Sequence, residues 1–366
     1  MKKILIISVS AGAGHVQAAR ALEQTAKVIY PDHTVKHIDL MDYVTPALKS
    51  AIVDAYGFIV KNAPSLWQFI YKKTDNEKRL KHMDRLMKHV NQLNAKRLYM
   101  LLDEFSPDHV ICTHSFPAQV IQQSKKKEHH NIPISLVVTD YGWHSYWVLK
   151  NITNYFVATE KMKWEMAYHH VDTPVYVTGI PVRPVFLEEK NIESLKKKYN
   201  VSKDKKIILI LSGGQGIGAN EEVIHDIANH APLHWSHLIF IVGKNNALEE
   251  KLKTVQKKVK DITLDVIGWT DAMDEYMRIA DVIVSKPGGS TTSECMALNK
   301  KMVAFKPIPG QEESNALHIL ENGFGYRAGN TEELLYYIER VLGDQKNSLV
   351  KKAESSAELI LGQVIQ

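Results

Sequence analysis

The stretch of sequence that decides the fold is VIVSKPGGSTTSECMAL, residues 282–298. Its first four residues form a short apolar run that predicts a buried strand, and its last residues continue as a helix. Between them lie Gly288 and Gly289, which let a ligand approach the backbone closely. A glycine loop that leads into a helix N-terminus, followed by the hydroxyls of Ser290 and Thr291, suits a diphosphate.

Two further polar groups extend this pattern. Glu294 lies one helical turn further on, where a carboxylate could accept both hydroxyl groups of a ribose. The alternative is a capped turn, with a Ser or Thr N-cap and the glutamate closing a capping box. After the next strand, PIPGQEESNA at 307–316 again opens a helix, and Gln311 and Glu312 suit the hydroxyls of a sugar. The alternative there is a helix start enriched in acids by the helix dipole.

Short apolar runs separated by amphipathic segments of helix length recur along the whole chain. This alternation predicts parallel sheets covered by helices on both faces. The expected strands are 3–9, 35–40, 109–112, 134–138, 155–158, 175–177, 207–211, 238–242, 263–267, 282–285 and 302–305. Two such sets predict an α/β protein with two doubly wound parallel-sheet (Rossmann-like) domains.

The boundary between the two sets is expected near Thr178–Lys205, where Gly179–Pro184 breaks regular structure and a charged helix follows. We therefore predict an N-terminal domain at 1–180, a C-terminal domain at 181–345, and a last helix within 346–366 that returns to the first domain or stays with the second. Ligands of doubly wound sheets bind outside the carboxyl ends of the strands. The site is therefore expected in a cleft between two facing domains.

Composition places the chain among ordinary globular proteins: 366 residues, 45% hydrophobic and 24% charged. Two cysteines make no disulfide framework, which favours a reducing cytoplasm. The N-terminal MKKILIISVSAGAGH has too short an apolar run for a signal peptide and is predicted to be a strand that enters a glycine loop. Nowhere are there the 18 or more consecutive apolar residues of a membrane span.

The net charge of +5 is unevenly distributed, because Lys49–Arg97 holds eleven Lys and Arg against four Asp and Glu. This segment begins with the aromatic stretch Pro46–Tyr71, which includes Trp67 and Phe69. An amphipathic, aromatic segment beside cations is attracted to an anionic membrane surface. A solvated helix over an apolar core is the alternative, and nucleic acid is disfavoured because no nucleic-acid motif accompanies the patch.

His15 ends the loop Gly12–His15 at the start of a helix, where it suits a general base. A neutral imidazole near its ordinary pKa matches that task, and the helix N-terminus disfavours the imidazolium. The alternative is a histidine that merely caps the helix. Asp140 and Asp39 both lie at strand ends. They are equal candidates to orient His15 or the acceptor, the substrate whose hydroxyl proton such a base would take.

The combined order and spacing of these motifs resemble glycosyltransferase family 28, in the branch of the monogalactosyldiacylglycerol synthases and processive diacylglycerol glucosyltransferases. The pattern S-[KR]-x-G-x-x-T-x-x-E followed by Q-[QE]-x-x-N-A is matched by Ser285–Glu294 and Gln311–Ala316. The early G-x-G-H loop is Gly12–His15, T-D-x-x-x-H-x-x-W is Thr139–Trp147, and V-T-G-[IL]-P is Val177–Pro181. The resemblance covers nearly the whole chain and implies a GT-B fold, in which the two domains face each other across a cleft.

The resemblance also implies roles for individual residues. Glu294 would bind the ribose, Gln311 and Glu312 the donor sugar, Arg183 the diphosphate, and the backbone near Trp269 the uracil. The implied donor-binding set is Gly14, Arg183, Gly214, Gln215, Trp269, Gly289, Ser290, Thr291, Thr292, Ser293, Glu294, Gln311, Glu312 and Asn315. His15 and Asp140 would be catalytic. His144 and Trp147 would contact the acceptor, or else serve only to pack their loop.

These expectations combine into an inverting transferase that moves glucose or galactose from a UDP-sugar to diacylglycerol, on the cytoplasmic face of the cell membrane. No cofactor and no catalytic metal are expected, since helix dipoles, Arg183 and backbone N–H groups could offset the charge of departing UDP. A lipid-linked cell-wall N-acetylglucosaminyltransferase is the near alternative, although the chain has Gln311-Glu312 where that enzyme has paired glutamines. A UDP-sugar epimerase and a non-catalytic UDP-sugar sensor are the more distant ones.

Overall fold

The computed structural model describes residues 1–366 except for 11, 76–93, 214–220, 260–261, 345–354 and 366. The chain divides into two compact units. Unit 1 comprises Met1–Pro184, Pro309–Gln311 and Glu354–Gln366, and unit 2 comprises Val185–Ile308 and Glu312–Ala353. The chain leaves unit 1 after Pro184, close to the boundary that the sequence predicts.

Unit 1 contains one sheet of six parallel strands in the order β2-β1-β3-β4-β5-β6. Its strands are β1 (Lys3–Ser8), β2 (Thr34–Asp39), β3 (His109–Cys112), β4 (Ile134–Val137), β5 (Asn154–Val157) and β6 (Val175–Val177). Successive side chains of a strand point to opposite faces. Accordingly, Ile4 and Ile6 join one apolar cluster of unit 1, and Leu5 and Ile7 join another. Both faces of the sheet are thus buried.

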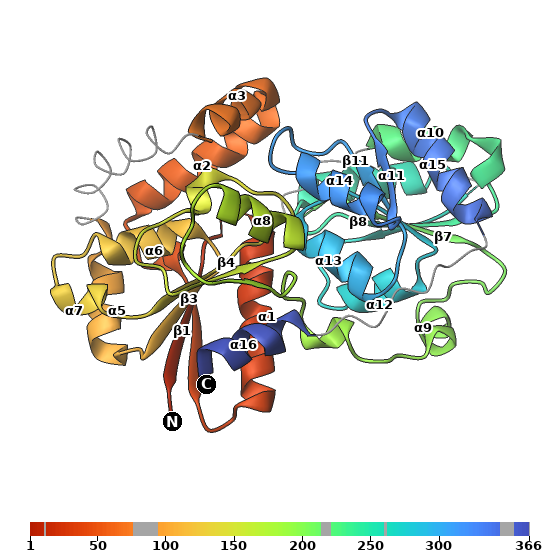
Figure 1. Ribbon diagram of the computed structural model, residues 1–366. Coiled ribbons are helices and arrows are strands. Elements are labelled where there is room, and N and C mark those ends of the chain that lie inside the picture. The colour runs from red at the N-terminus through yellow and green to blue at the C-terminus, as the bar shows by residue number, and fades with distance from the viewer. Residues whose placement is uncertain (11, 76–93, 214–220, 260–261, 345–354, 366) are drawn as a thin grey trace. The chain divides into compact units, whose positions relative to one another are not determined.

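The helices of unit 1 are α1 (Ala13–Ile29), α2 (Pro46–Asn62), α3 (Pro64–Thr74), α5 (Lys96–Phe105), α6 (Ser115–Gln122), α7 (Lys127–His130), α8 (Glu160–Tyr168) and α16 (Ser356–Ile365), with 3₁₀ turns η1 (Leu40–Asp42) and η2 (Ser145–Trp147). All of them except α3 contribute buried side chains. The C-terminal α16 lies beside α1 (Figure 1), and its Ile360 and Leu361 are fully buried in the cluster that holds Ile4 and Ile6. The last helix therefore packs in unit 1.

Unit 2 contains the second sheet, also of six parallel strands, in the order β12-β11-β10-β7-β8-β9. Its strands are β7 (Ile207–Leu211), β8 (His237–Ile241), β9 (Thr263–Ile267), β10 (Val282–Ser285), β11 (Met302–Phe305) and β12 (Gly325–Ala328). The flanking elements are α9 (Ile192–Lys198), α10 (Glu221–Asn229), α11 (Asn246–Gln256), α12 (Met273–Ile279), α13 (Gly289–Ala297), α14 (Glu313–Glu321), α15 (Thr331–Gly343), η3 (Pro184–Phe186) and η4 (Ala231–Leu233). This is the strand order of dinucleotide-binding domains.

The eleven strands that the sequence predicts are all present, with ends shifted by a residue at several of them. The sequence prediction missed β12, whose first and last residues are buried and whose two central residues are partly exposed and exposed. A single strand of this kind at a sheet edge has no continuous apolar run to reveal it. The helix expected across 346–364 is observed from Ser356, and its first part lies outside the described residues.

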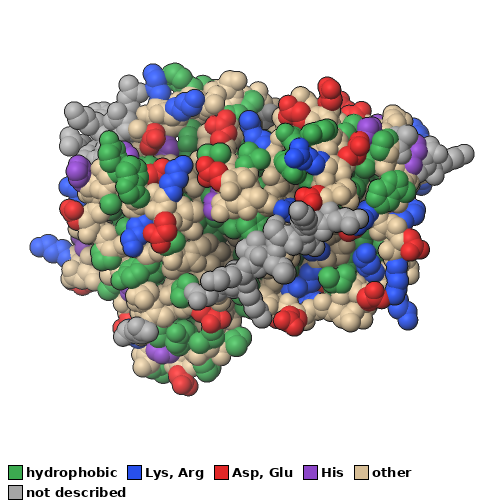
Figure 2. All heavy atoms as spheres, turned by 45° about the vertical axis from the view of Figure 1, so that its right-hand side comes forward, with side chains coloured by type: hydrophobic (Ala, Val, Ile, Leu, Met, Phe, Trp, Pro, Cys, Tyr) green, Lys and Arg blue, Asp and Glu red, His purple; other side chains and the backbone are tan. Residues whose placement is uncertain are grey.

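Charged side chains of both signs are interspersed over the face seen in Figure 2. The positive net charge of the chain therefore does not form one continuous basic field on that face.

Candidate functional site

In unit 1, β1 and β3 are adjacent in the sheet but not consecutive in sequence, since β2 pairs with the other side of β1. This is a topological switch point, where the connections from neighbouring strands diverge and leave a crevice at the carboxyl edge. His15 lies in the first turn of α1, which follows β1, and Thr113 directly follows β3. The histidine that the sequence selects is therefore at the position where doubly wound sheets bind ligands.

The His15 side chain is held by two threonines. Its Nδ1 is 2.9 Å from the carbonyl oxygen of Thr113 and 2.7 Å from Oγ1 of Thr139, and Thr113 Oγ1 donates to the carbonyl oxygen of His15 at 2.9 Å. A carbonyl oxygen only accepts hydrogen bonds, so Nδ1 must carry the proton and donate it. This assigns the lone pair of the ring to Nε2, which is the nitrogen that can act as a base.

Burial determines the charge of this imidazole. His15 is 9% exposed, and desolvation lowers its pKa to about 4, with the hydrogen bond to Thr113 opposing that shift. The sequence prediction of a pKa near its ordinary value is therefore wrong, because α1 and the loops after β3 and β4 exclude water from the ring. The ring is neutral at pH 7, as a general base requires.

The two carboxylates that the sequence offered as supports for His15 differ in their surroundings. Asp39 Oδ1 accepts hydrogen bonds from the backbone N–H groups of Ser10 (3.2 Å) and Met41 (3.0 Å), so it fastens two loops together. Asp140 is buried beside Thr139 at the end of β4. The groups that hold Nδ1 are those of Thr113 and Thr139, which the sequence reasoning missed. The place of Thr113, directly after the neighbouring strand at the switch point, was the signal that could have identified it.

Aromatic rings enclose the imidazole. The ring of His114 meets that of His15 edge-on at 4.7 Å between centroids, and the indole of Trp147 lies at 6.4 Å. His114 Nδ1 accepts from the backbone N–H of Phe116 at 3.0 Å and so caps α6, and burial lowers its pKa well below its ordinary value. Two neutral histidines thus lie side by side in a poorly hydrated part of unit 1.

His144 and Trp147 are packing residues in unit 1, which is the alternative that the sequence left open for them. Each is 1% exposed. His144 Nδ1 accepts from the N–H of Tyr146 at 3.1 Å, and its Nε2 donates to the carbonyl oxygen of Tyr71 at 2.9 Å. The ring of Tyr71 lies 4.2 Å from that of His144. His144 therefore anchors α3 to the loop after β4.

In unit 2, the carboxyl ends of β7 and β10 form the corresponding switch point. Gly288 is the N-cap of α13 and has no side chain to bond the first N–H groups of the helix, which remain directed at the site. The alternative of a capped turn closed by Glu294 is therefore wrong. Instead, Ser290 Oγ donates to Glu294 Oε1 at 3.3 Å, and Ser293 Oγ donates to the carbonyl oxygen of Gly289 at 2.8 Å.

The first turns of α13 are well packed. Gly289, Ser290, Thr292, Ser293 and Glu294 are buried, and Thr291 is partly exposed. A buried carboxylate next to a helix start that lacks a capping side chain is a polar site with fixed geometry, as a phosphate and ribose pocket requires.

Glu312 joins the two predicted donor loops of unit 2. Its carboxylate is 3.8 Å from the ammonium of Lys286 and accepts from the backbone N–H of Ile308 at 2.8 Å. Glu312 is 7% exposed, and Asn315 in the first turn of α14 is fully buried. These contacts hold the loop after β10 against the loop after β11. Gln311 belongs to the short stretch Pro309–Gln311 that groups with unit 1.

Trp269 follows β9 at the same edge of the sheet. Its indole is 52% exposed, and the Lys244 ammonium lies 4.8 Å from the ring centroid. A Cβ at Gly268 would approach a carboxylate oxygen of Glu249 to 2.7 Å, so the backbone before Trp269 is closely packed. An exposed ring beside a cation at a strand end is available to a ligand.

The remaining predicted residues are distributed as follows. Gly14 lies in the first turn of α1, and Arg183 is partly buried at the end of unit 1. Gly214 and Gln215 lie outside the described residues. Gly213, which directly precedes them, has a φ of 76°, in the left-handed region that favours glycine. Among the residues that the structure describes, no group of three or more His, Cys, Asp or Glu side chains is placed to hold a metal ion.

The predicted membrane segment forms α2 and α3. Phe58, Leu66 and Phe69 are 67%, 50% and 54% exposed, Trp67 is partly buried, and the Lys73 ammonium lies 4.4 Å from the centre of the Phe69 ring. Most of the lysine-rich part that follows lies outside the described residues. Within the described ranges, no helix combines the length and the apolar character that crossing a bilayer needs. These helices therefore display large apolar side chains to the surroundings of unit 1.

Comparison with known families divides the chain in two. Residues 15–182 match the monogalactosyldiacylglycerol (MGDG) synthase family, and residues 207–359 match the glycosyltransferase family 28 C-terminal domain. The processive diacylglycerol beta-glucosyltransferase of Bacillus subtilis is 30% identical, over 100% of this chain and 95% of its own length.

Two solved structures show how widely the fold is shared. The spinosyn rhamnosyltransferase SpnG, complexed with spinosyn aglycone, aligns with a TM-score of 0.60 at 10% identity over 100% of both chains. The UDP-GlcNAc 2-epimerase of Methanocaldococcus jannaschii, in complex with UDP-GlcNAc and UDP, aligns with a TM-score of 0.57 at 15% identity over 99% of both. The GT-B fold class is thereby confirmed. At these identities the alignments support the fold and nothing finer.

Proposed function

Because this chain belongs to glycosyltransferase family 28, in the branch of the monogalactosyldiacylglycerol synthases and processive diacylglycerol glucosyltransferases, we propose that it transfers a hexose from a UDP-sugar to diacylglycerol. Glucose is the first choice of hexose, since the Bacillus subtilis relative is named for glucosyl transfer, and galactose is the alternative. The product is a β-hexosyl-diacylglycerol, formed with inversion at the anomeric carbon.

The observation that carries this proposal is the buried, neutral His15 with its proton on Nδ1. In the proposed step, Nε2 takes the proton of the diacylglycerol hydroxyl as that oxygen attacks the anomeric carbon of the sugar. The bond from the anomeric carbon to the UDP oxygen breaks, and UDP leaves with that electron pair. The carbonyl oxygen of Thr113 then stabilises the imidazolium through Nδ1–H, as an orienting group does in other base-assisted transfers. We assign Asp140, buried beside Thr139, to support the charge of that imidazolium.

The donor side is assigned to unit 2. Glu294 holds the ribose hydroxyls, and the first N–H groups of α13 hold the diphosphate. Helix dipole and N–H groups stabilise the charge that develops on UDP, with Arg183 as a further cation. On this basis we propose that catalysis needs neither a cofactor nor a divalent metal. Treatment with EDTA, which removes trace metals, should therefore leave the transfer rate unchanged. Loss of activity that Mg²⁺ or Mn²⁺ restores would overturn that part of the proposal.

The acceptor side is assigned to unit 1. Diacylglycerol lies within a bilayer, so the enzyme has to reach it from the membrane surface. We propose that the exposed rings of α2 and α3, with the lysines beside them, dock unit 1 on an anionic membrane from the cytoplasmic side.

One assay tests the whole proposal. Purified protein is incubated with UDP-glucose or UDP-galactose, radiolabelled in the sugar, and with vesicles that contain diacylglycerol. We expect label in the organic phase for one donor, and a β linkage in the product by NMR. Epimerised nucleotide sugar without a lipid product would overturn the proposal in favour of an isomerase on the same fold. Binding of UDP-sugar without turnover would favour a sensor.

A further inference from the structure

The imidazole of His15 has a neighbour whose hydrogen-bonding group the proposed mechanism leaves unused. His114 directly follows Thr113 at the carboxyl end of β3, and its ring meets that of His15 at 4.7 Å between centroids, with an interplanar angle of 75°. Both rings therefore lie at the switch point of unit 1, where doubly wound sheets bind their ligands.

The proton of the His114 ring is on Nε2. Its Nδ1 lies 3.0 Å from the backbone nitrogen of Phe116, at the N-cap of α6. A backbone N–H only donates, so Nδ1 has to be the nitrogen with the lone pair, and a neutral imidazole then carries its proton on Nε2. The ring is neutral because burial, and to a smaller extent His15, lower its pKa well below its ordinary value. His114 thus presents an N–H donor, whereas His15 presents a lone pair on its own Nε2.

His144 shows the same arrangement with its donor in use. It caps η2 through Nδ1, which accepts from the N–H of Tyr146 at 3.1 Å, and its Nε2 donates to the carbonyl oxygen of Tyr71 at 2.9 Å. Within the part of the chain that the structure describes, no group accepts from Nε2 of His114, and none donates to Nε2 of His15. His114 is partly exposed, so its N–H is open to a ligand.

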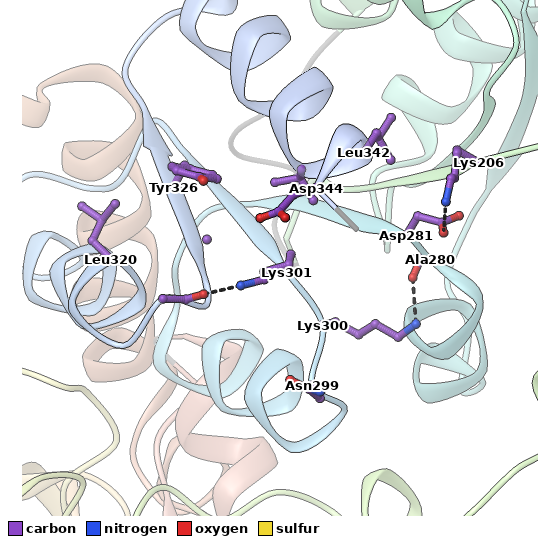
Figure 3. Close-up of a pocket in the computed structure, with 13 residues that line it drawn as sticks. Lys206, Ala280, Asp281, Asn299, Lys300, Lys301, Leu320, Tyr326, Leu342 and Asp344 are labelled. Carbon is purple, nitrogen blue, oxygen red and sulfur yellow. Dashed lines mark hydrogen bonds and ion pairs between the residues drawn. The ribbon is translucent and has the colours of Figure 1, made fainter. Parts of the chain in front are cut away.

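A cavity of unit 2, at the amino ends of its strands, differs in this respect (Figure 3). The Lys300 ammonium there donates to the carbonyl oxygen of Ala280 at 2.8 Å. The Lys301 ammonium donates to that of Gly323. These donors hold neighbouring loops of unit 2 together, whereas the two Nε2 atoms at the switch point of unit 1 are available to a substrate.

We propose that Nε2–H of His114 donates a hydrogen bond to the acceptor hydroxyl whose proton Nε2 of His15 receives. A hydroxyl both donates and accepts, so one alcohol oxygen satisfies both nitrogens. An oxygen about 2.8 Å from each nitrogen bridges a separation of up to about 5.6 Å, and the two ring centroids are 4.7 Å apart. The inference rests on the proposed function, since it takes His15 as the base.

This arrangement orients the acceptor oxygen for attack. Its proton points to His15, one lone pair accepts from His114, and the other lone pair forms the bond to the anomeric carbon. His15 gains the proton, UDP leaves with the electron pair of the broken bond, and His114 keeps its proton throughout. A protonated amine has no lone pair to accept from His114. The two histidines therefore select a neutral alcohol as the acceptor.

The test compares an acceptor with an inhibitor that lacks only the hydroxyl. The whole protein is assayed in mixed micelles with 1,2-dioctanoylglycerol and the UDP-sugar that supports transfer, and 1,2-dioctanoyloxypropane is the competitive inhibitor. His114→Ser should raise the KM for dioctanoylglycerol by about tenfold, through the loss of one hydrogen bond. The Ki of the inhibitor should stay within about twofold, because it has no hydroxyl to couple with His114. An unchanged KM, or an equal rise of KM and Ki, would overturn the inference.

Two variants separate acceptor binding from the capping of α6. His114→Ser keeps an oxygen that can accept from the N–H of Phe116, but it has no donor within reach of the hydroxyl. His114→Gln keeps an amide N–H at the distance of Nε2 from the backbone, but it is the poorer cap. The glutamine variant should therefore have a KM for the acceptor closer to wild type than the serine variant has. The opposite order would show that the ring serves only to cap the helix.

Controls assign a negative result to the right step. His130→Ser, on an exposed histidine of unit 1, is the matched control and should behave as wild type. Far-UV circular dichroism and calorimetric titration with UDP verify that each variant is folded, and His114→Thr, which also caps helices, replaces a serine variant that does not fold. If the wild type makes no lipid product, the proposed function fails. If the wild type transfers and every folded His114 variant keeps its KM, only this inference fails.

Discussion

The carboxyl edges of the two sheets have the same architecture but carry different chemical groups. In unit 1 the switch point between β1 and β3 holds a buried histidine, whose charge and tautomer are set by desolvation and by Thr113. In unit 2 the switch point between β7 and β10 presents the uncapped start of α13 with a buried glutamate. The first arrangement suits proton transfer, and the second suits the binding of an anion with hydroxyl groups. We therefore expect substitutions at the unit 1 switch point to lower turnover, and substitutions at the unit 2 switch point to weaken donor binding.

The largest expected effect comes from His15→Ala. Removal of a general base lowers kcat by about 10³-fold, whereas the affinity for UDP should stay within about twofold, because the donor loops belong to unit 2. Transfer from radiolabelled UDP-glucose to diacylglycerol vesicles measures the first quantity, and calorimetric titration with UDP measures the second. His225→Ala, on an exposed histidine of α10, is the control. A rate within tenfold of wild type would show that another group is the base.

Glu294→Ala tests the other half of the comparison. The loss of a charged acceptor for two ribose hydroxyls should raise the KM for the UDP-sugar by about 10- to 100-fold, with a smaller change in kcat. Steady-state kinetics with varied donor separates the two parameters, and Glu321→Ala at the exposed end of α14 serves as the control. An unchanged KM would refute the ribose assignment.

Replacement of Phe58 and Phe69 by serine should weaken the membrane contact of unit 1. Two exposed rings contribute apolar area to a bilayer interface, so co-sedimentation with anionic vesicles should fall by about tenfold. Binding of the wild type should also weaken as salt is raised, because the lysines beside the rings are screened. UDP affinity should not change. If the double variant sediments like wild type at low salt, these helices are not the docking surface.

The last prediction concerns the pH dependence of stability and involves no substitution. The pKa of His15 is about 4 in the folded protein and about 6.5 in an unfolded chain, so the unfolded state binds the proton first as pH falls. The stability that the neutral ring contributes is complete above about pH 6.5 and is lost progressively down to about pH 4. Because burial also lowers the pKa of His109 to about 4, NMR of the labelled imidazoles is needed to follow His15 alone. A midpoint near 6.5 for His15 would contradict its burial.

Much of the fold could be predicted from hydrophobic periodicity, because fully buried parallel strands such as Ile207–Leu211 are continuous apolar runs. The edge strand β12 could not, since its two central residues are not buried and it has no continuous apolar run. The sequence also identified His15 and Glu294 through glycine loops that follow strands. The surroundings of His144 and Trp147 remained open until the structure joined His144 to α3 and placed Trp147 in the core of unit 1.

The sequence alone determined two doubly wound sheets, the loops that carry the chemistry, and a resemblance strong enough to name a family. These features are local, since periodicity, glycine placement and motif spacing are properties of short stretches of chain. The tertiary structure decided which nitrogen of His15 is the base, how far burial lowers its pKa, and that Thr113 and Thr139 hold it. It also decided that Glu294 caps no turn and that the ring of His114 lies against that of His15. All of these depend on contacts between residues distant in sequence, which no local pattern encodes.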